Sequence, residues 1–225
     1  MPDFEQINTK VIKAPVRAGQ QVIARRGAML AYTGRVTFAP AQAAIGSGSG
    51  GSLMGAAGRA MAGEHVPLMV AEGAGEIFYG HLGLHVTLVG LDGSQQLSVE
   101  SDRLLAQDAA LSTAVVFLGQ QGGIRGAVRG AVTGQGLFTT QLSGVGDVAL
   151  LAHGGTVSID VRPDKQVFVD PQAYVAHVGS VTLEVIVNAS WREAVGRGSG
   201  EAIQLKATGS GTVYVQASEQ KLKER

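Results

Sequence analysis

Hydrophobic residues recur at every second position in several short stretches of the chain. Three clear examples are residues 148–152, 157–161 and 181–187, where Val, Leu, Ile and Ala occupy alternate positions. Such alternation places apolar side chains on one face of a β-strand, so these stretches predict strands with one buried face. Turn dipeptides such as Asp92-Gly93 and Asp170-Pro171 separate the stretches. Apart from small residues near 56–62 and a charged tail, no segment has a helical period. The pattern predicts an all-β protein.

An internal repeat runs through the chain, anchored at Gln21, Gln96 and Gln166. Counted from each anchor, similar residues recur at equal distances, and alanine stands ten residues on in every copy. The recurring residues are Val22, Leu97 and Val167 at one residue on; Met29, Leu104 and Tyr174 at eight; Leu30, Leu105 and Val175 at nine; Ala31, Ala106 and Ala176 at ten; Val36, Leu111 and Val181 at fifteen; and Thr37, Ser112 and Thr182 at sixteen. This recurrence predicts copies of one structural unit.

A second motif follows the first in each copy. It reads EGAGEIFY, SGVGDVAL and TGSGTVYV, and its glycine pairs are Gly73/Gly75, Gly144/Gly146 and Gly209/Gly211. Two motifs in the same order predict three tandem β units, which we place at residues 1–88, 89–156 and 157–225. We expect the glycines to allow a positive-φ turn or bulge before an inward-facing strand. We expect the repeated alanine to mark a close contact between sheets, where a larger side chain would overpack.

Composition narrows the possible functions. Eighteen basic residues balance eighteen acidic ones, so no overall field attracts the chain to nucleic acid or anionic lipid. The absence of cysteine excludes disulfides, thiolate catalysis and cysteine-ligated metal. The first fifteen residues contain no apolar core of a secretory signal, and no stretch is long and apolar enough for a transmembrane helix. We therefore expect a soluble, cytoplasmic protein.

These motifs, together with RAGQQVIARRGAMLAY, RAMAGE and DKQVFVDPQAYVAH, cover nearly the whole chain. In this order they resemble the family named for altered inheritance of mitochondria, number twenty-four, a mitochondrial-biogenesis family with many prokaryotic members. The resemblance implies a fold similar to that of the tryptophan RNA-binding attenuation protein, with three double-stranded β-helix or sandwich units in one chain. It also implies a ring-shaped homotrimer, and it brings no catalytic residues or cofactor. Because no transit-peptide-like segment begins the sequence, we expect a prokaryotic member.

Candidate catalytic and metal-binding residues are few. His81 and His85 could share one face of a strand, but they lack the spacing of a β-helix metal site, and we expect ordinary histidines there. His65, His153 and His177 are isolated. GSGSGG at 46–51 lacks the strand–turn–helix context of a dinucleotide site, and no nucleophile–base pattern is present. We therefore expect no enzyme and no cofactor.

A glycine-rich segment lies between the two motifs of each copy, at residues 41–63, 119–136 and 194–200. Their arginines, Arg59, Arg125, Arg129 and Arg197, are the best candidates for a basic binding face. Nucleic-acid binding is not expected, because basic residues do not recur at equivalent positions and aromatic residues are scarce. An anionic lipid or an acidic partner would fit better, by peripheral contact.

The sequence thus predicts a non-catalytic structural or interaction module, a ring-shaped scaffold with an unidentified protein partner. One alternative is a small-molecule or metal carrier, or an enzyme, with a pocket between units near His81, His85 or His153. A further alternative is lipid or nucleic-acid binding through the arginine-containing loops.

Overall fold

The computed structural model of the chain describes residues 3–41, 67–117, 138–187 and 203–219. Fifteen strands and one short 3₁₀ helix occupy most of these residues, and their elements include no α-helix, which confirms the all-β prediction. The strands form one eight-stranded and one seven-stranded sheet.

The eight-stranded sheet has the order β1-β2-β5-β3-β8-β11-β6, with β4 paired to β5. Its strands are β1 (Glu5–Asn8), β2 (Val11–Val16), β3 (Val22–Arg25), β4 (Met29–Pro40), β5 (Leu68–Tyr79), β6 (His85–Asp92), β8 (Leu104–Asp108) and β11 (Val145–Ala152).

The seven-stranded sheet has the order β12-β15-β14-β7-β10-β9, with β13 paired to β15. Its strands are β7 (Leu97–Glu100), β9 (Ser112–Phe117), β10 (Phe138–Ser143), β12 (Thr156–Val161), β13 (Val167–Val169), β14 (Tyr174–Val187) and β15 (Ile203–Gln216).

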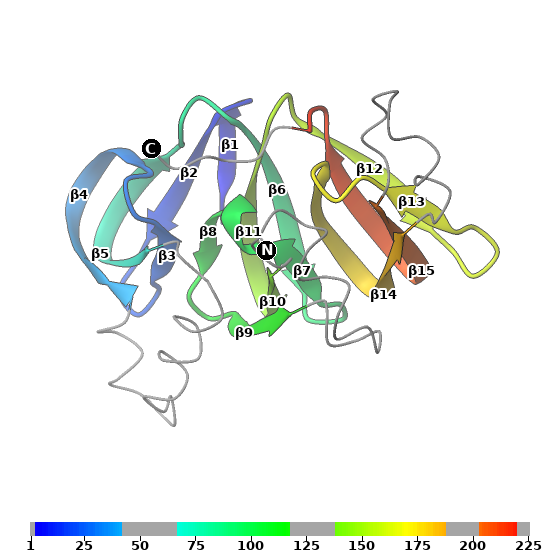
Figure 1. Cartoon of the computed structure of the whole chain (residues 1–225). Helices are drawn as coiled ribbons and strands as arrows, with labels where there is room; N and C mark the ends of the chain where they lie inside the picture. Colours follow the sequence, from blue (N-terminus) through cyan, green and yellow to red (C-terminus); the bar gives the residue numbers. More distant parts are fainter. Residues whose placement is uncertain (1–2, 42–66, 118–137, 188–202, 220–225) are drawn as a thin grey trace.

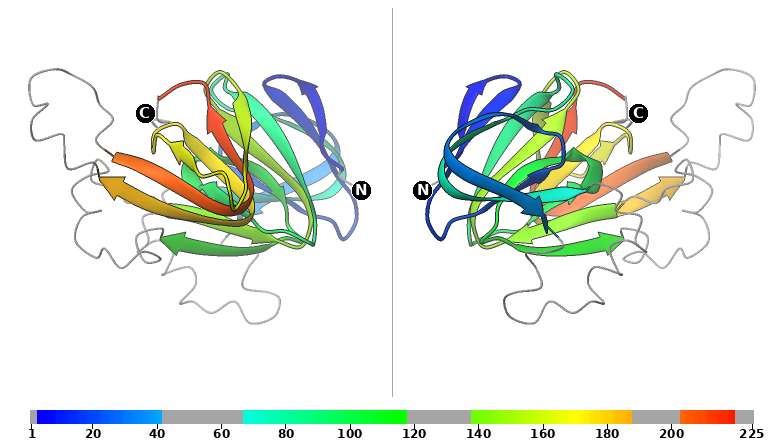
Figure 2. Two further views of the ribbon diagram at one scale, coloured as in Figure 1. Left: turned by 90° about the vertical axis from the view of Figure 1, so that its right-hand side faces the viewer. Right: turned by 90° about the vertical axis from the view of Figure 1, so that its left-hand side faces the viewer.

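One long antiparallel hairpin stands at each end of the molecule (Figure 1). At one end β4 pairs along the whole of β5, whose other edge holds β2 and β3. At the other end β14 pairs along β15, whose other edge holds β12 and β13. The two views in Figure 2 look onto these ends, with β14 and β15 nearest the viewer in one and β4 and β5 in the other.

In the middle of the chain, the counterparts of these long paired strands are divided between the two sheets. The 3₁₀ helix η1 (Ser101–Arg103) follows β7 of the second sheet and leads into β8 of the first. In the same way β10 of the second sheet continues through Gly144 into β11 of the first. These two crossings, together with those from β6 to β7, from β8 to β9 and from β11 to β12, connect the sheets covalently.

A β-bulge recurs one residue before each repeated alanine. The pairing register shifts between Met29 and Ala31, across the partners of Leu104 and Ala106, and between Tyr174 and Ala176. Past the bulge, each alanine lies opposite the third residue after the second glycine of its copy. These pairs are Ala31 with Phe78, Ala106 with Ala149, and Ala176 with Tyr214. The sequence repeat therefore coincides with a repeat of strand register.

Three apolar clusters follow one another along the molecule. The first contains Ile12 and Ile77, the second contains Leu142 and Leu150, and the third contains Leu205 and Val213. Neighbouring copies share these clusters. Leu105 and Ala106 belong to the first cluster, and Val175 and Ala176 belong to the second, so the second and third copies insert their bulge residues into the core of the copy before them.

The three-unit division stays a prediction. The boundary expected after residue 88 falls inside β6, because this strand pairs with β11 along its whole length. The boundary expected after residue 156 falls at the first residue of β12.

Candidate functional site

Large apolar side chains lie exposed on β4, at one end of the molecule. Met29 is 42% exposed, Leu30 57% and Tyr32 48%. Tyr32 contacts Phe38 of the same strand edge-to-face, with ring centroids 5.4 Å apart. Among the described residues, β4 pairs only with β5, so its outer edge also presents backbone N–H and C=O groups. Exposed apolar groups on a long edge strand mark an interaction surface.

The equivalent side chains in the other copies are buried. Leu104 and Leu105 of β8 and Tyr174 and Val175 of β14 are at most 3% exposed. The difference has a simple cause, because β3 pairs with β8 and β7 pairs with β14, whereas no described strand covers β4 in this way. The apolar residues on β4 are therefore of the types that are buried in the other copies, at a position that no described strand covers.

The second-motif glycines of the first and third copies allow two paired strands to approach closely. An added Cβ at Gly73 would overlap a carbonyl of β4, and one at Gly209 would overlap a carbonyl of β14. Gly75 and Gly211 likewise face carbonyls of these two strands. All four glycines lie inside β5 or β15, and not before a strand as the sequence led us to expect. Close approach of the backbones, which a sequence does not display, accounts for the difference.

The glycine pair of the middle copy behaves differently. Gly144 has φ 115° and forms the bend between β10 and β11, so it precedes a strand as expected. Gly146 departs from that expectation, since it lies inside β11, opposite Leu91 of β6. Its φ is 157°, and an added Cβ would lie 2.7 Å from Oδ2 of Asp108 rather than against a backbone carbonyl. Gly146 therefore leaves room for the carboxylate of Asp108. The three glycine pairs are equivalent in sequence, but the middle pair contacts different groups from the other two.

A polar pocket of about 680 Å³ opens where β7 meets β14. None of the residues that line it is Asp, Glu, Lys or Arg, and most carry hydroxyl or amide groups. The polar side chains are those of Ser94, Gln95, Gln96, Ser98, Gln141, His177, Ser180, Thr182 and Ser210. Gln96 donates a hydrogen bond from Nε2 to Oε1 of Gln141 at 3.4 Å. Neutral donors and acceptors of this kind suit an uncharged polar ligand.

His177 stands at the wall of this pocket and stays neutral. Burial lowers its pKa from 6.5 to about 4. Its Nδ1 lies 2.8 Å from the hydroxyl of Tyr174, which donates in turn to the carbonyl of Ser98 at 3.2 Å. Because the hydroxyl of Tyr174 is already directed at Ser98, a satisfied core contact explains the pair.

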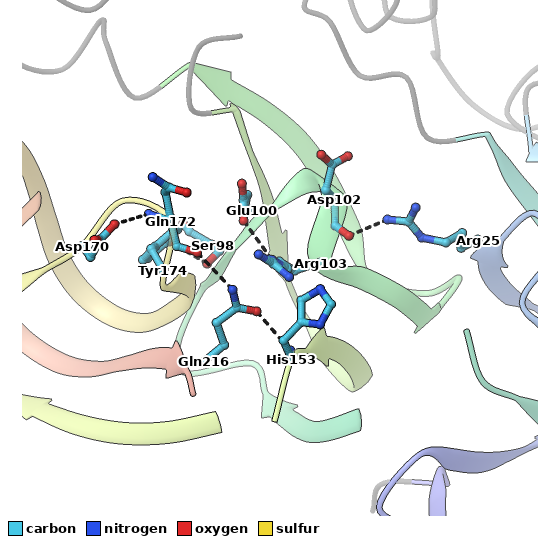
Figure 3. Close-up of polar contacts among 10 residues, drawn as sticks. All are labelled: Arg25, Ser98, Glu100, Asp102, Arg103, His153, Asp170, Gln172, Tyr174 and Gln216. Carbon is cyan, nitrogen blue, oxygen red and sulfur yellow. Dashed lines mark hydrogen bonds and ion pairs between the residues drawn. The ribbon is translucent and has the colours of Figure 1, made fainter. Parts of the chain in front are cut away.

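A buried polar cluster lies beside the pocket, around η1 (Figure 3). Arg103 is 1% exposed and donates from Nε to Oε2 of Glu100 at 3.0 Å. Gln216 accepts a hydrogen bond from the backbone N–H of His153 at 3.0 Å and donates to the carbonyl of Gln172 at 3.1 Å. Burial, and then the charge of Arg103, lower the pKa of His153. This cluster joins the last residues of β15 to the middle of the molecule, and a cation is disfavoured next to Arg103.

The buried carboxylate of Asp147 holds the start of the chain, and the half-buried carboxylate of Asp108 holds Asp147 in turn. Asp147 of β11 accepts a hydrogen bond from the backbone N–H of Phe4 at 2.7 Å, and its own N–H donates to Asp108 at 2.6 Å. Burial raises the pKa of both carboxyl groups. Each carboxylate is occupied by a backbone N–H, so a structural role explains both.

The candidate residues from the sequence lie in different parts of the chain, and several lie outside the described residues. Arg59, Arg125, Arg129 and Arg197, and likewise His65, lie outside the described residues. His81 lies in a turn and His85 begins β6, and the described part of the chain gathers no group of three or more metal-ligating side chains. The pocket is lined by none of His81, His85 and His153, the histidines near which we expected it. Only His177 belongs to it, and its burial was not visible in the sequence.

The described residues thus form an all-β fold with exposed apolar side chains on one edge strand. The profile of the family described as mitochondrial biogenesis AIM24 matches residues 4–218, and the chain belongs to this family, as its motifs predict. The fold is similar to that of a Streptococcus pyogenes protein solved by X-ray crystallography. The TM-score is 0.69 at 20% sequence identity, over 96% of this chain and 92% of that one. None of the curated proteins compared matches the chain.

Within the described residues, no helix is long and apolar enough to cross a membrane.

Proposed function

We propose that the chain is a non-catalytic structural and interaction module of the cytoplasm that works as a ring-shaped homo-oligomer. The observation that carries this proposal is the exposed apolar edge of β4, which a monomer would leave in water. Burial of a side chain such as Leu30 stabilises an interface by about 2 kcal/mol. A protein partner of this surface explains the residue types on β4 without any catalytic group.

The proposed unit of the ring is a triplet of related β units with boundaries near residues 88 and 156. The recurring bulge and the recurring alanine register support this organisation. A fold similar to the tryptophan RNA-binding attenuation protein, and three chains per ring, follow from the family resemblance. Three chains of three units would place nine units in one ring.

The mass of the protein in solution tests this proposal. We expect native mass spectrometry of gently purified protein to give three times 23.1 kDa, with the same state in sedimentation over a wide concentration range. A monomer at all concentrations would contradict the proposal.

A second candidate function rests on the polar pocket between β7 and β14. Its uncharged lining favours a neutral hydroxyl-rich ligand over a metal or an anion. A thermal-shift screen with sugars and polyols would test this, with Thr182→Trp as the variant that fills the pocket. Stabilisation that the variant loses supports the carrier function, and no stabilisation of the original chain contradicts it.

Binding of lipid or nucleic acid through Arg59, Arg125, Arg129 and Arg197 remains a sequence-based hypothesis, because no described residue bears on it.

A further inference from the structure

Two junctions inside the chain join consecutive copies, and they share one register. At the first, β3 pairs antiparallel with β8, and Ala24 lies opposite Ala106. At the second, β7 pairs antiparallel with β14, and Val99 lies opposite Ala176. Counted from the repeat anchors, both junctions place the third residue of one copy opposite the tenth of the next.

The remaining pairs agree in the same way. In the first junction Ile23 lies opposite Gln107 and Val22 opposite Asp108. In the second, Ser98 lies opposite His177 and Leu97 opposite Val178. The register is therefore a property of the repeat and not of either junction alone.

Each junction ends on an equivalent backbone hydrogen bond. The N–H of Ala109 donates to the carbonyl of Gln21 at 3.0 Å, and the N–H of Gly179 donates to the carbonyl of Gln96 at 3.1 Å. Both donors stand thirteen residues after the anchor of their copy, and both acceptors are the anchors themselves. The repeat thus specifies hydrogen bonds as well as neighbours.

The chain contains both halves of a third junction, unjoined. Strand β13 is the counterpart of β3 and β7, and among the described residues it pairs only with β15. Strand β4 is the counterpart of β8 and β14, and it pairs only with β5 within the same residues. The two strands lie at opposite ends of the molecule (Figure 1), so they cannot meet within one chain.

We propose that β4 of one copy pairs antiparallel with β13 of a second copy of this chain, in the register of the two internal junctions. Ala31 then lies opposite Val169, Tyr32 opposite Phe168, and Thr33 opposite Val167. The N–H of Gly34 donates to the carbonyl of Gln166 of the neighbouring copy. This inference rests on the proposed oligomer and names its contact surface.

This pairing accounts for the exposed apolar residues at both ends of the molecule. Tyr32 is 48% exposed on β4 and Phe168 is 53% exposed on β13, and the register makes them a cross-strand aromatic pair. Leu30 corresponds to Leu105 and Val175, which enter the core of the preceding copy. In the assembly Leu30 reaches the third apolar cluster of the neighbour, into which no described strand of another copy inserts its bulge residues.

The contact uses two different surfaces, so it is heterologous. Each copy offers one β4 and one β13, and repetition of the contact produces a closed ring when the rotation between copies closes. A two-fold dimer, in which the same strand meets itself, does not satisfy this register.

Disulfide trapping tests the register directly, because the chain has no cysteine of its own. Positions 32 and 168 would lie about 5.5 Å apart between Cα atoms, which is within the range of a disulfide. We expect the double variant Tyr32→Cys/Phe168→Cys to form disulfides between chains under mild oxidation by oxidised glutathione. We expect mass spectrometry of the digest to place the bond between positions 32 and 168.

The matched control is Thr37→Cys/Phe168→Cys, which moves one cysteine along the same exposed strand. Its two positions would lie about 17 Å apart in the proposed register, too far for a disulfide. The single variants Tyr32→Cys and Phe168→Cys should each stay unlinked alone and form a one-to-one linked pair when mixed.

The outcomes separate this inference from the proposed function. An oligomer that links at positions 32 and 168 supports both. An oligomer that fails to link there, or that links equally well at positions 37 and 168, overturns the register while the oligomer stands. A monomer that never links overturns both.

Discussion

Val99 of β7 lies directly opposite Ala176 of β14, and both side chains are fully buried. The pair joins the second copy of the repeat to the third. Ala24 and Ala106 form the equivalent pair between the first copy and the second. In both places a small side chain lets two strands bury a shared apolar cluster. The corresponding alanine of the first copy, Ala31, is exposed, since among the described strands β4 pairs only with β5.

The assembly should depend on Leu30. Leu30→Lys places a charge where the proposed contact buries an apolar side chain, so we expect association to weaken about 100-fold. The fold of each chain should be unchanged, because Leu30 is 57% exposed there. Sedimentation velocity against concentration measures the change.

Val145→Lys is the matched control, since Val145 is 62% exposed and begins β11, which pairs with β6 and β8 and with neither β4 nor β13. We expect it to assemble like the original chain. Equal assembly of both variants would exclude β4 from the contact.

The second-motif glycines should be intolerant of a side chain. Gly209 has φ 110°, and an added Cβ would overlap the carbonyl of Ser180 on β14. We expect Gly209→Ala to lower the free energy of unfolding by about 3 kcal/mol. Gly19 has a similar φ of 83° but no atom within 4 Å of an added Cβ, so Gly19→Ala should cost about 1 kcal/mol. Urea denaturation compares the two, and equal losses would mean that close strand approach is unimportant.

Acid should destabilise the fold through His177. Its pKa is about 4 in the folded chain against 6.5 for the ordinary group, so its contribution is present above pH 6.5 and is lost as the pH falls toward 4. Between pH 7 and pH 5 the loss amounts to about 2 kcal/mol. His177→Gln should remove this part of the pH dependence.

The variant must be compared with the original chain at each pH. Asp108 and Asp147 have raised pKa values, and they act in the opposite direction, because their stability contribution is lost as the pH rises. Their effect cancels in the difference between the two proteins. A difference that does not change with pH would contradict the burial of a neutral His177.

The ion pair of Arg103 and Glu100 should matter because it is buried. Glu100→Gln leaves the guanidinium of Arg103 without its counter-charge at 1% exposure, and we expect a loss of about 3 kcal/mol. The double variant Glu100→Gln/Arg103→Met should regain part of the lost free energy of unfolding, because it no longer buries an unpaired charge. Asp160→Asn breaks a solvent-exposed pair with Arg162 and should leave the denaturation midpoint unchanged. The same midpoint for all three variants would contradict this assignment.

Much of the architecture was predictable from the spacing of residues. The period-two alternation predicted the all-β fold, and the anchors at Gln21, Gln96 and Gln166 aligned positions that share one strand register. The family resemblance was confirmed along the chain. The division of the middle copy between two sheets was not predictable, because η1 and Gly144 differ little in sequence from the uninterrupted strands of the other copies.

The candidate surface was harder to find. Met29 and Leu30 match buried apolar residues in both other copies, so any sequence pattern assigns them to a core. Their exposure depends on which copy comes first in the chain, and only the three-dimensional pairing of β3 with β8 and β7 with β14 displays it. Once the pairings of β3 with β8 and of β7 with β14 are known, the missing partner of β4 among the described strands identifies this surface.

Amide hydrogen exchange along β4 measures whether a second copy of the chain covers this strand. In the assembled protein we expect the amides of residues 30–34 to be as protected as those of β8 and β14, and we expect Leu30→Lys to abolish that protection at low concentration. Residues 167–169 of β13 should gain and lose protection together with β4. Rapid exchange along the outer edge of β4 at every concentration would show that no second copy covers it, and would contradict the proposed pairing of β4 with β13.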